Sequence, residues 1–155
     1  KIDFSDFPAI LTGIVFGPIQ GILIEIVKNI IHLTRTTTFG IGEIMNIVIG
    51  SSMILSMSLS VKTFKKIFKS NKINLKIYFI SSAITIIIAI VMGWIANLVF
   101  TPIFYNIMGI PLVTETYLAG VWGSTTLNSI KAIFNILPFF PIYFAIEKGV
   151  KKYTI

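Results

Sequence analysis

The chain has 155 residues, of which 55% are hydrophobic and only 12% are charged. Soluble domains carry about 25% charged residues, so a water-facing globule is excluded. The composition predicts an all-α integral membrane protein, with residues 1–155 forming one compact helix bundle. The net charge of +7 comes mainly from lysines in Lys62–Lys76 and Lys148–Lys152, a pattern typical of cytoplasmic membrane flanks and not of a nucleic-acid-binding surface.

The first apolar stretch, Phe7–Leu33, is interrupted by Gly17-Pro18. Because proline cannot donate to the helix hydrogen-bond ladder, this stretch is either one kinked span or two short spans that meet at a turn. Gly13, Gly17 and Gly21 recur every fourth residue, which is the small-residue spacing that allows helices to approach closely.

Three later segments are apolar and long enough to span a membrane: Glu43–Ser60, Ile77–Phe100 and Ser124–Glu147. Three loops are predicted before and between these segments. Thr34–Gly42 is polar, Lys62–Lys76 is basic, and Phe104–Gly123 is irregular. Ser52, Ser56 and Ser60 form a second stripe of small residues within the first of these spans. In the last span, Pro138 and Pro141 are expected to bend its second half.

The lysines also predict an orientation. Short loops rich in lysine resist translocation, so we expect Lys62–Lys76 and the C-terminus to face the cytoplasm in a multi-pass protein of the cell membrane. Thr34–Gly42 and Phe104–Gly123 would then lie outside. We therefore expect a ligand to bind at that outer face.

Polar side chains inside the apolar spans are the best candidates for function, because a charge in hydrocarbon costs several kcal/mol unless it faces a partner or a cavity. In the last span Asn128, Lys131 and Asn135 share one helical face. We favour ligand contact for Asn128 and Lys131 over the alternative that Lys131 extends to the outer interface and the asparagines bond neighbouring helices. For Asn135 we favour helix packing.

A second polar group lies in the first apolar stretch. Glu25 and Lys28 are three residues apart and are followed by Asn29 and His32, which fits a structural clasp and the wall of a polar pocket equally well. Asn46 and Asn97 are single amides within spans, where an interhelical contact is the commoner role.

No enzyme motif is present in the sequence, which has neither a zinc-protease, a nucleophile-elbow nor a phosphate-loop pattern. With no cysteine and one histidine, the chain is expected to hold no metal and no cofactor. It also has no means of energising transport by itself.

Several residue blocks resemble a known family. These are Lys1–Pro8 (KIDFSDFP), Gly17–Gly21 (GPIQG), Glu25–Asn29 (EIVKN), Gly42–Asn46 (GEIMN), and then Asn97, Pro102 and Asn128–Lys131 (NSIK). In this order they resemble the substrate-binding S components of energy-coupling factor (ECF) vitamin transporters, most closely the riboflavin-specific subfamily. The resemblance covers nearly the whole chain.

The resemblance implies six transmembrane helices, of which five lie in this chain and the first lies upstream of Lys1. It implies a turn at Gly17-Pro18, a vitamin site near the outer face, and partners in the form of a transmembrane coupling subunit and two ABC-type ATPases. We predict that Asn128 and Lys131 hydrogen-bond riboflavin. We expect three further side chains to complete the polar lining: Lys28, Asn46 and Asn97.

Two places depart from the riboflavin pattern. Thr126-Leu127 occupy the positions where that subfamily has Pro-Phe. Leu98, which follows Asn97, occupies a position where that subfamily has an aromatic residue. An S component for another vitamin, such as pantothenate, is therefore one alternative. A membrane scaffold protein, in which the buried polar groups only fasten helices, is the other.

Overall fold

The computed structural model describes residues 5–36, 39–138 and 141–145. Within that part of the chain it contains no strand, and the predicted all-α fold is confirmed. The helices are α1 (Phe7–Val15), α2 (Pro18–Leu33), α3 (Ile41–Ile67), α4 (Leu75–Ile107) and α5 (Thr114–Ile136). A short helical segment at 141–145 follows.

The first apolar stretch forms two helices, so the interpretation as one kinked span is wrong. Gly17 adopts a φ of 123°, a conformation that side chains rarely allow, and Pro18 opens α2 at a position where no backbone N–H is needed. Gly17 is therefore the turn. Gly13 and Gly21 do pack closely, since a Cβ on Gly21 would lie 2.8 Å from the Cα of Gly13.

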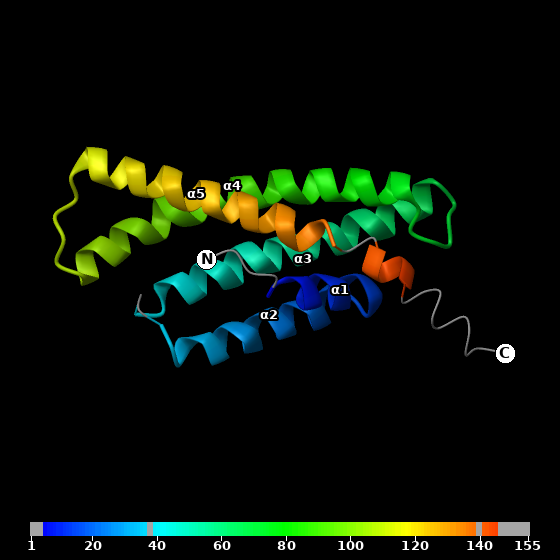
Figure 1. Cartoon of the computed structure of the whole chain (residues 1–155), viewed down its shortest axis with the longest axis horizontal. Coiled ribbons are helices and arrows are strands. Elements are labelled where there is room, and N and C mark those ends of the chain that lie inside the picture. The colour runs from blue at the N-terminus through cyan, green and yellow to red at the C-terminus, as the bar shows by residue number, and fades with distance from the viewer. Residues whose placement is uncertain (1–4, 37–38, 139–140, 146–155) are drawn as a thin grey trace.

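By length and composition, α3 and α4 can each cross a membrane, and a third candidate span begins within α5 at Tyr117. α1 and α2 are shorter, with 9 and 16 residues. They form a hairpin that packs against α3. Figure 1 shows this hairpin beside α3, with α4 and α5 running back along each other on the other side.

The predicted basic loop is partly wrong. α3 continues to Ile67 and α4 already begins at Leu75, so Lys62, Lys65 and Lys66 are helical. Lysine is a good helix former, and a long charged side chain can extend from the end of an apolar helix to the membrane surface.

The predicted irregular segment Phe104–Gly123 is also much shorter than expected. α4 continues past Pro102 to Ile107, and α5 begins at Thr114 rather than at Ser124. Gly109 adopts a φ of 66°, which permits the chain to turn between the two helices. Glycines at 120 and 123 are accommodated within α5 because they disfavour a helix by only about 1 kcal/mol each.

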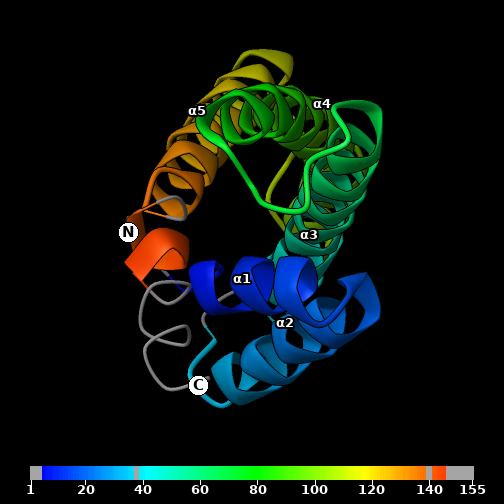
Figure 2. The ribbon, with the colours of Figure 1, turned by 90° about the vertical axis from the view of Figure 1, so that its right-hand side faces the viewer.

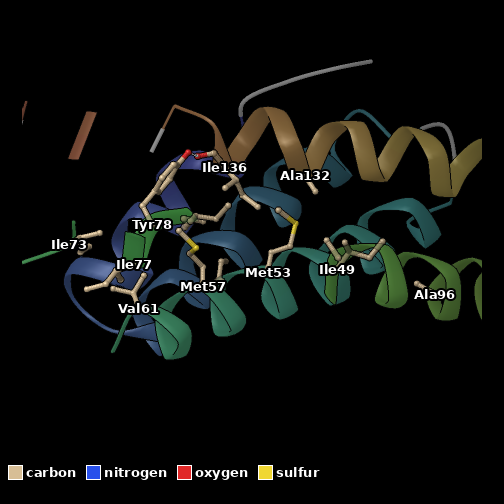
Figure 3. Packing of buried hydrophobic residues seen from close by; sticks show 14 residues of the cluster. Ile49, Met53, Met57, Val61, Ile73, Ile77, Tyr78, Ala96, Ala132 and Ile136 are labelled. Carbon is tan, nitrogen blue, oxygen red and sulfur yellow. Dashed lines mark hydrogen bonds between the residues drawn. The ribbon is translucent and has the colours of Figure 1, made fainter. Parts of the chain in front are cut away.

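The apolar core is centred on α3, which contacts α1, α2 and α4. Figure 3 shows Ile49, Met53, Met57 and Val61 following one another along α3, with Ile136 of α5 nearby. The hydroxyl of Tyr78 donates to the backbone oxygens of Ile136 and Leu137, at 3.2 and 3.1 Å. This contact ties the start of α4 to the end of α5.

The bundle has two chemically different ends. We call the end that carries Gly17 and the α3–α4 connection the lysine end, and the end that carries the α2–α3 and α4–α5 connections the cavity end. In Figure 1 the lysine end lies at the right and the cavity end at the left, and Figure 2 views the bundle from the lysine end.

Candidate ligand-binding site

A cavity of about 410 Å³ lies among the first turns of α3, the second half of α4 and the middle of α5. Pockets for small molecules measure about 300–1,000 Å³, so this volume suits one ligand of vitamin size. The lining residues come from all three helices: Ile41, Gly42, Met45, Asn46, Asn97, Phe100, Thr101, Phe104, Tyr105, Gly120, Ser124, Leu127 and Asn128.

Three amides, one from each helix, provide most of the hydrogen-bonding capacity of this wall. Asn97 donates to the backbone oxygen of Gly93 at 2.8 Å and to the hydroxyl of Thr125 at 3.3 Å. The amides of Asn46 and Asn128 form no hydrogen bond with any other described residue. Each of these two amides therefore has donors and an acceptor available to a ligand.

The rest of the wall is largely apolar, and much of it is aromatic. Phe100, Phe104 and Tyr105 follow one another along the cavity side of α4. Aromatic rings offer flat surfaces on which a planar ligand can stack. Gly120 lies opposite, where a Cβ would be 3.6 Å from the hydroxyl of Tyr105, so the α5 wall stays open at that point.

A void of about 10 Å³ lies next to this cavity and shares two of its lining residues, Asn46 and Asn128. Its other polar lining residues are Asp6 and Lys131. The volume corresponds to about one water molecule. Lys131 thus borders the small void rather than the cavity itself, and it lies on the same helical face as Asn128.

Lys131 belongs to a buried charge cluster. Its ammonium nitrogen lies 3.1 Å from Oδ2 of Asp6, and Oδ1 of the same carboxylate pairs with Lys28. Lys28 in turn donates to both oxygens of Glu25, at 2.6 and 2.7 Å. Among the described residues, two carboxylates thus pair with two ammonium groups, and such pairing lowers the cost of burying charge.

Two further amides and a glycine belong to the described part of the cluster. Asn29 donates to Oε1 of Glu25 at 2.8 Å, and Oδ1 of Asn135 accepts from the backbone N–H of Asp6 at 3.1 Å. A Cβ on Gly50 would lie 2.6 Å from the carboxylate of Glu25, so α3 leaves space for this carboxylate only because residue 50 is glycine. The cluster joins α2, α5 and the residue before α1.

The predicted site residues thus divide into two groups. Asn46, Asn97 and Asn128 line the cavity together, and Lys131 lies beside it. Lys28 lines neither the cavity nor the small void, and its ammonium forms the clasp with Glu25. His32 is exposed and takes no part in the described clasp.

Asp6 is the residue that sequence reasoning missed. It is 3% exposed and pairs with both half-buried lysines, Lys28 and Lys131. Charge balance was the available signal, because one carboxylate, Glu25, cannot neutralise Lys28 and Lys131 at once. The chain has only six acidic residues, so few candidates for a second carboxylate existed.

Comparisons with known proteins agree with this architecture. A family model described as the substrate-specific component of ECF transporters matches residues 1–143. A solved structure described as "Structure and mechanism of the S component of a bacterial ECF transporter" is similar with a TM-score of 0.63 and 22% sequence identity, over 96% of this chain and 79% of that chain. At that identity the likeness establishes the fold.

Two curated proteins are similar in sequence. Riboflavin transporter FmnP of Bacillus subtilis (strain 168) is 26% identical over 157 residues, which cover 98% of this chain and 79% of that protein. Riboflavin transporter RibU of Staphylococcus aureus (strain TCH60) is 34% identical over 55 residues, which cover 36% of this chain and 29% of that protein.

Proposed function

The chain belongs to the family of ECF transporter substrate-specific components, and we propose that it is the membrane subunit that binds riboflavin for an ATP-driven importer. Membership of this family makes it a transporter component and not an enzyme. The two curated relatives are both named as riboflavin transporters, which supports riboflavin as the ligand.

The single observation that carries the proposal is the pair of unengaged amides, Asn46 and Asn128, on the wall of the 410 Å³ cavity. The pyrimidine edge of the flavin ring alternates carbonyl acceptors with an N–H donor. Carboxamides match such an edge because each one both donates and accepts. Asn97, from α4, adds its amide oxygen as an acceptor, since its amide nitrogen already donates to Gly93 and Thr125.

The aromatic wall suits the rest of the flavin. Phe100, Phe104 and Tyr105 provide ring faces against which a flat three-ring system can pack, and aromatic pairs contribute about 0.5–1.5 kcal/mol beyond simple burial. The sugar-like ribityl chain needs polar neighbours, and Thr101 and Ser124 provide hydroxyls on the same cavity.

Lys131 completes the site in this proposal. Its ammonium has three donors, and the described carboxylate of Asp6 lies 3.1 Å away. In this proposal one donor of the ammonium reaches past Asn128 toward a carbonyl oxygen of the ligand, while the ion pair with Asp6 stays in place. Lys28 acts through Asp6, because both lysines share that carboxylate.

Transport requires partners in this proposal. A binding site alone can only equilibrate its ligand between free and bound forms, so accumulation needs a source of free energy. The coupling subunit and two ABC-type ATPases that the family resemblance implies would supply it. The cavity end would face outside, where the vitamin is captured, and the lysine end would face the cytoplasm.

Titration of the purified protein tests the ligand directly. Flavin fluorescence should be quenched at one equivalent of riboflavin, whereas a panel of other vitamins including pantothenate should not compete. Binding of pantothenate in a calorimetric titration, with no quenching of flavin fluorescence by the protein, would assign the site to the alternative vitamin. A protein inert to the whole panel would favour the scaffold function.

The residues that depart from the riboflavin pattern bear on this choice. Leu98 is exposed on the outside of α4 and does not line the cavity, and Thr126 is exposed as well. Leu127 is the one departing residue on the cavity wall. It leaves an aliphatic surface there, so the departures alter one side of the site and leave its three amides in place.

A further inference from the structure

A second cavity, of about 450 Å³, lies at the lysine end of the bundle. It shares no lining residue with the first cavity. Its walls are the α1–α2 turn around Gly17, the second half of α3, Ile73 of the α3–α4 connection, and Tyr143 of the short segment at 141–145. The vitamin site and this cavity are therefore separate features at opposite ends of the molecule.

Two lysines give this cavity a positive wall. Lys62 and Lys65 both line it, and a separation of three residues places them on one face of α3. Neither ammonium group has an ion-pair or hydrogen-bond partner within the described part of the chain, and no described acidic residue lines the cavity. Two neighbouring ammonium groups without a carboxylate favour an anionic ligand.

A buried hydroxyl adds a second, independent observation. Ser58 lines the same cavity, is 7% exposed, and its Oγ has no hydrogen-bond partner among the described residues. A Cβ on Gly13 would lie 2.9 Å from this oxygen, so the glycine keeps that side of the hydroxyl uncovered. A buried hydroxyl without a partner is unfavourable, and a ligand acceptor would satisfy it.

The rest of the cavity wall is apolar. Leu59, Val61 and Ile73 contribute aliphatic surface next to the two ammonium groups. The lysines follow the apolar part of a helix long enough to span a membrane, so they lie at the level of the lipid headgroups. These walls are complementary to a ligand that is anionic at one end and apolar at the other.

We propose that this cavity is a binding site for an anionic phospholipid, with the headgroup phosphate held between Lys62 and Lys65 and the start of an acyl chain against Leu59 and Ile73. Basic pockets between helices at the membrane surface recognise such headgroups. Ser58 provides the additional donor. The site does not depend on which vitamin the other cavity takes.

Delipidated protein in detergent, titrated with phosphatidylglycerol or phosphatidylcholine and observed by native mass spectrometry, tests the proposal. Phosphatidylglycerol should bind at one preferred site and phosphatidylcholine should not. The variant Lys62→Gln/Lys65→Gln should weaken phosphatidylglycerol binding by roughly tenfold to thirtyfold. Ser58→Ala should weaken it by a few-fold, since one neutral hydrogen bond is lost.

The matched control is Lys66→Gln/Lys69→Gln, which removes the same charge from the same end at exposed positions outside the cavity. It should change lipid binding less than threefold. Both variants should keep the thermal stability and vitamin affinity of the parent protein, which shows that they fold.

Three results would overturn the proposal. One is equal loss of lipid binding in the cavity variant and the control, which would indicate general surface charge. Another is displacement of the lipid by inorganic phosphate alone at millimolar concentration, which would indicate a site for a free anion. The third is unchanged lipid binding with loss of coupling-subunit binding, which would make the cavity a protein interface.

Discussion

Lys131 of α5 and Asp6, the residue before α1, form an ion pair with 3.1 Å between Nζ and Oδ2. This pair links the helix that carries Asn128 to the start of the α1–α2 hairpin. Because the same carboxylate also pairs with Lys28, Asp6 connects the candidate vitamin site to the clasp with Glu25. The first prediction concerns this connection.

Replacing Lys131 by alanine should weaken riboflavin binding about tenfold to hundredfold, because a hydrogen bond from a charged group contributes roughly 1.5–3 kcal/mol. It should also lower the melting temperature, since Asp6 loses one of its two described cationic partners. Fluorescence quenching measures the first effect and a thermal-shift assay the second. Asp6→Asn is the matched variant, and its affinity loss should be smaller because the Lys131 donor remains. Unchanged affinity with lower stability in Lys131→Ala would make Lys131 structural only.

Removal of either free amide should reduce affinity without affecting stability. Asn46→Ala and Asn128→Ala should each weaken riboflavin binding about twofold to tenfold, which corresponds to one neutral hydrogen bond. Their melting temperatures should stay near that of the parent, because neither amide bonds another described residue. Asn106→Ala, at an exposed position of α4 outside the cavity, is the control. Equal affinity for all three variants would contradict the proposed amide contacts.

Gly50→Ala should destabilise the fold. The added Cβ would lie 2.6 Å from the Glu25 carboxylate, and relieving such overpacking in a core typically costs about 1–3 kcal/mol. Gly123→Ala has no atom within 4 Å of its added Cβ, so it should be neutral or slightly stabilising. Thermal unfolding in detergent compares the two. A Gly50→Ala variant as stable as Gly123→Ala would show that the clasp tolerates displacement of Glu25.

Cysteine labelling can test the orientation, because the chain contains no natural cysteine. We expect Lys69→Cys to be protected from an impermeant maleimide added to intact cells, and Ile110→Cys to be labelled. The physical reason is that lysine-rich connections remain in the cytoplasm. Both positions are exposed in the structure, so both should react after permeabilisation. External labelling of position 69 in intact cells would reverse the assigned topology.

Energy coupling gives the last prediction. The full-length protein alone in liposomes should bind riboflavin but not concentrate it, because binding equilibrates a ligand without doing work. Addition of the coupling subunit and the ATPases, with ATP on the ATPase side, should produce uptake against a gradient. A non-hydrolysable ATP analogue serves as the control. Concentrative uptake by the protein alone, with ion gradients collapsed, would refute the importer mechanism.

The membrane fold was predictable from local chemistry. The high apolar content indicated that the helices are surrounded by lipid. Gly17-Pro18 marked the place where a helix must be interrupted. The choice between a kink and a turn at that place needed the family resemblance. Helix ends were less predictable. Lysines beyond Ser60 and glycines at 120 and 123 suggested loops, but weak local preferences yield to helix propagation and packing.

The sequence by itself determined which groups cannot face lipid, since a charge in hydrocarbon is costly wherever it occurs. Only the tertiary structure decided how those groups divide. It joins Asp6 to Lys28 and Lys131 across the bundle, and it leaves Asn46 and Asn128 on the wall of a cavity. The reason is that ion pairing depends on distances between helices that are far apart in the chain. The free-energy cost of an unpaired charge depends only on the medium that surrounds it.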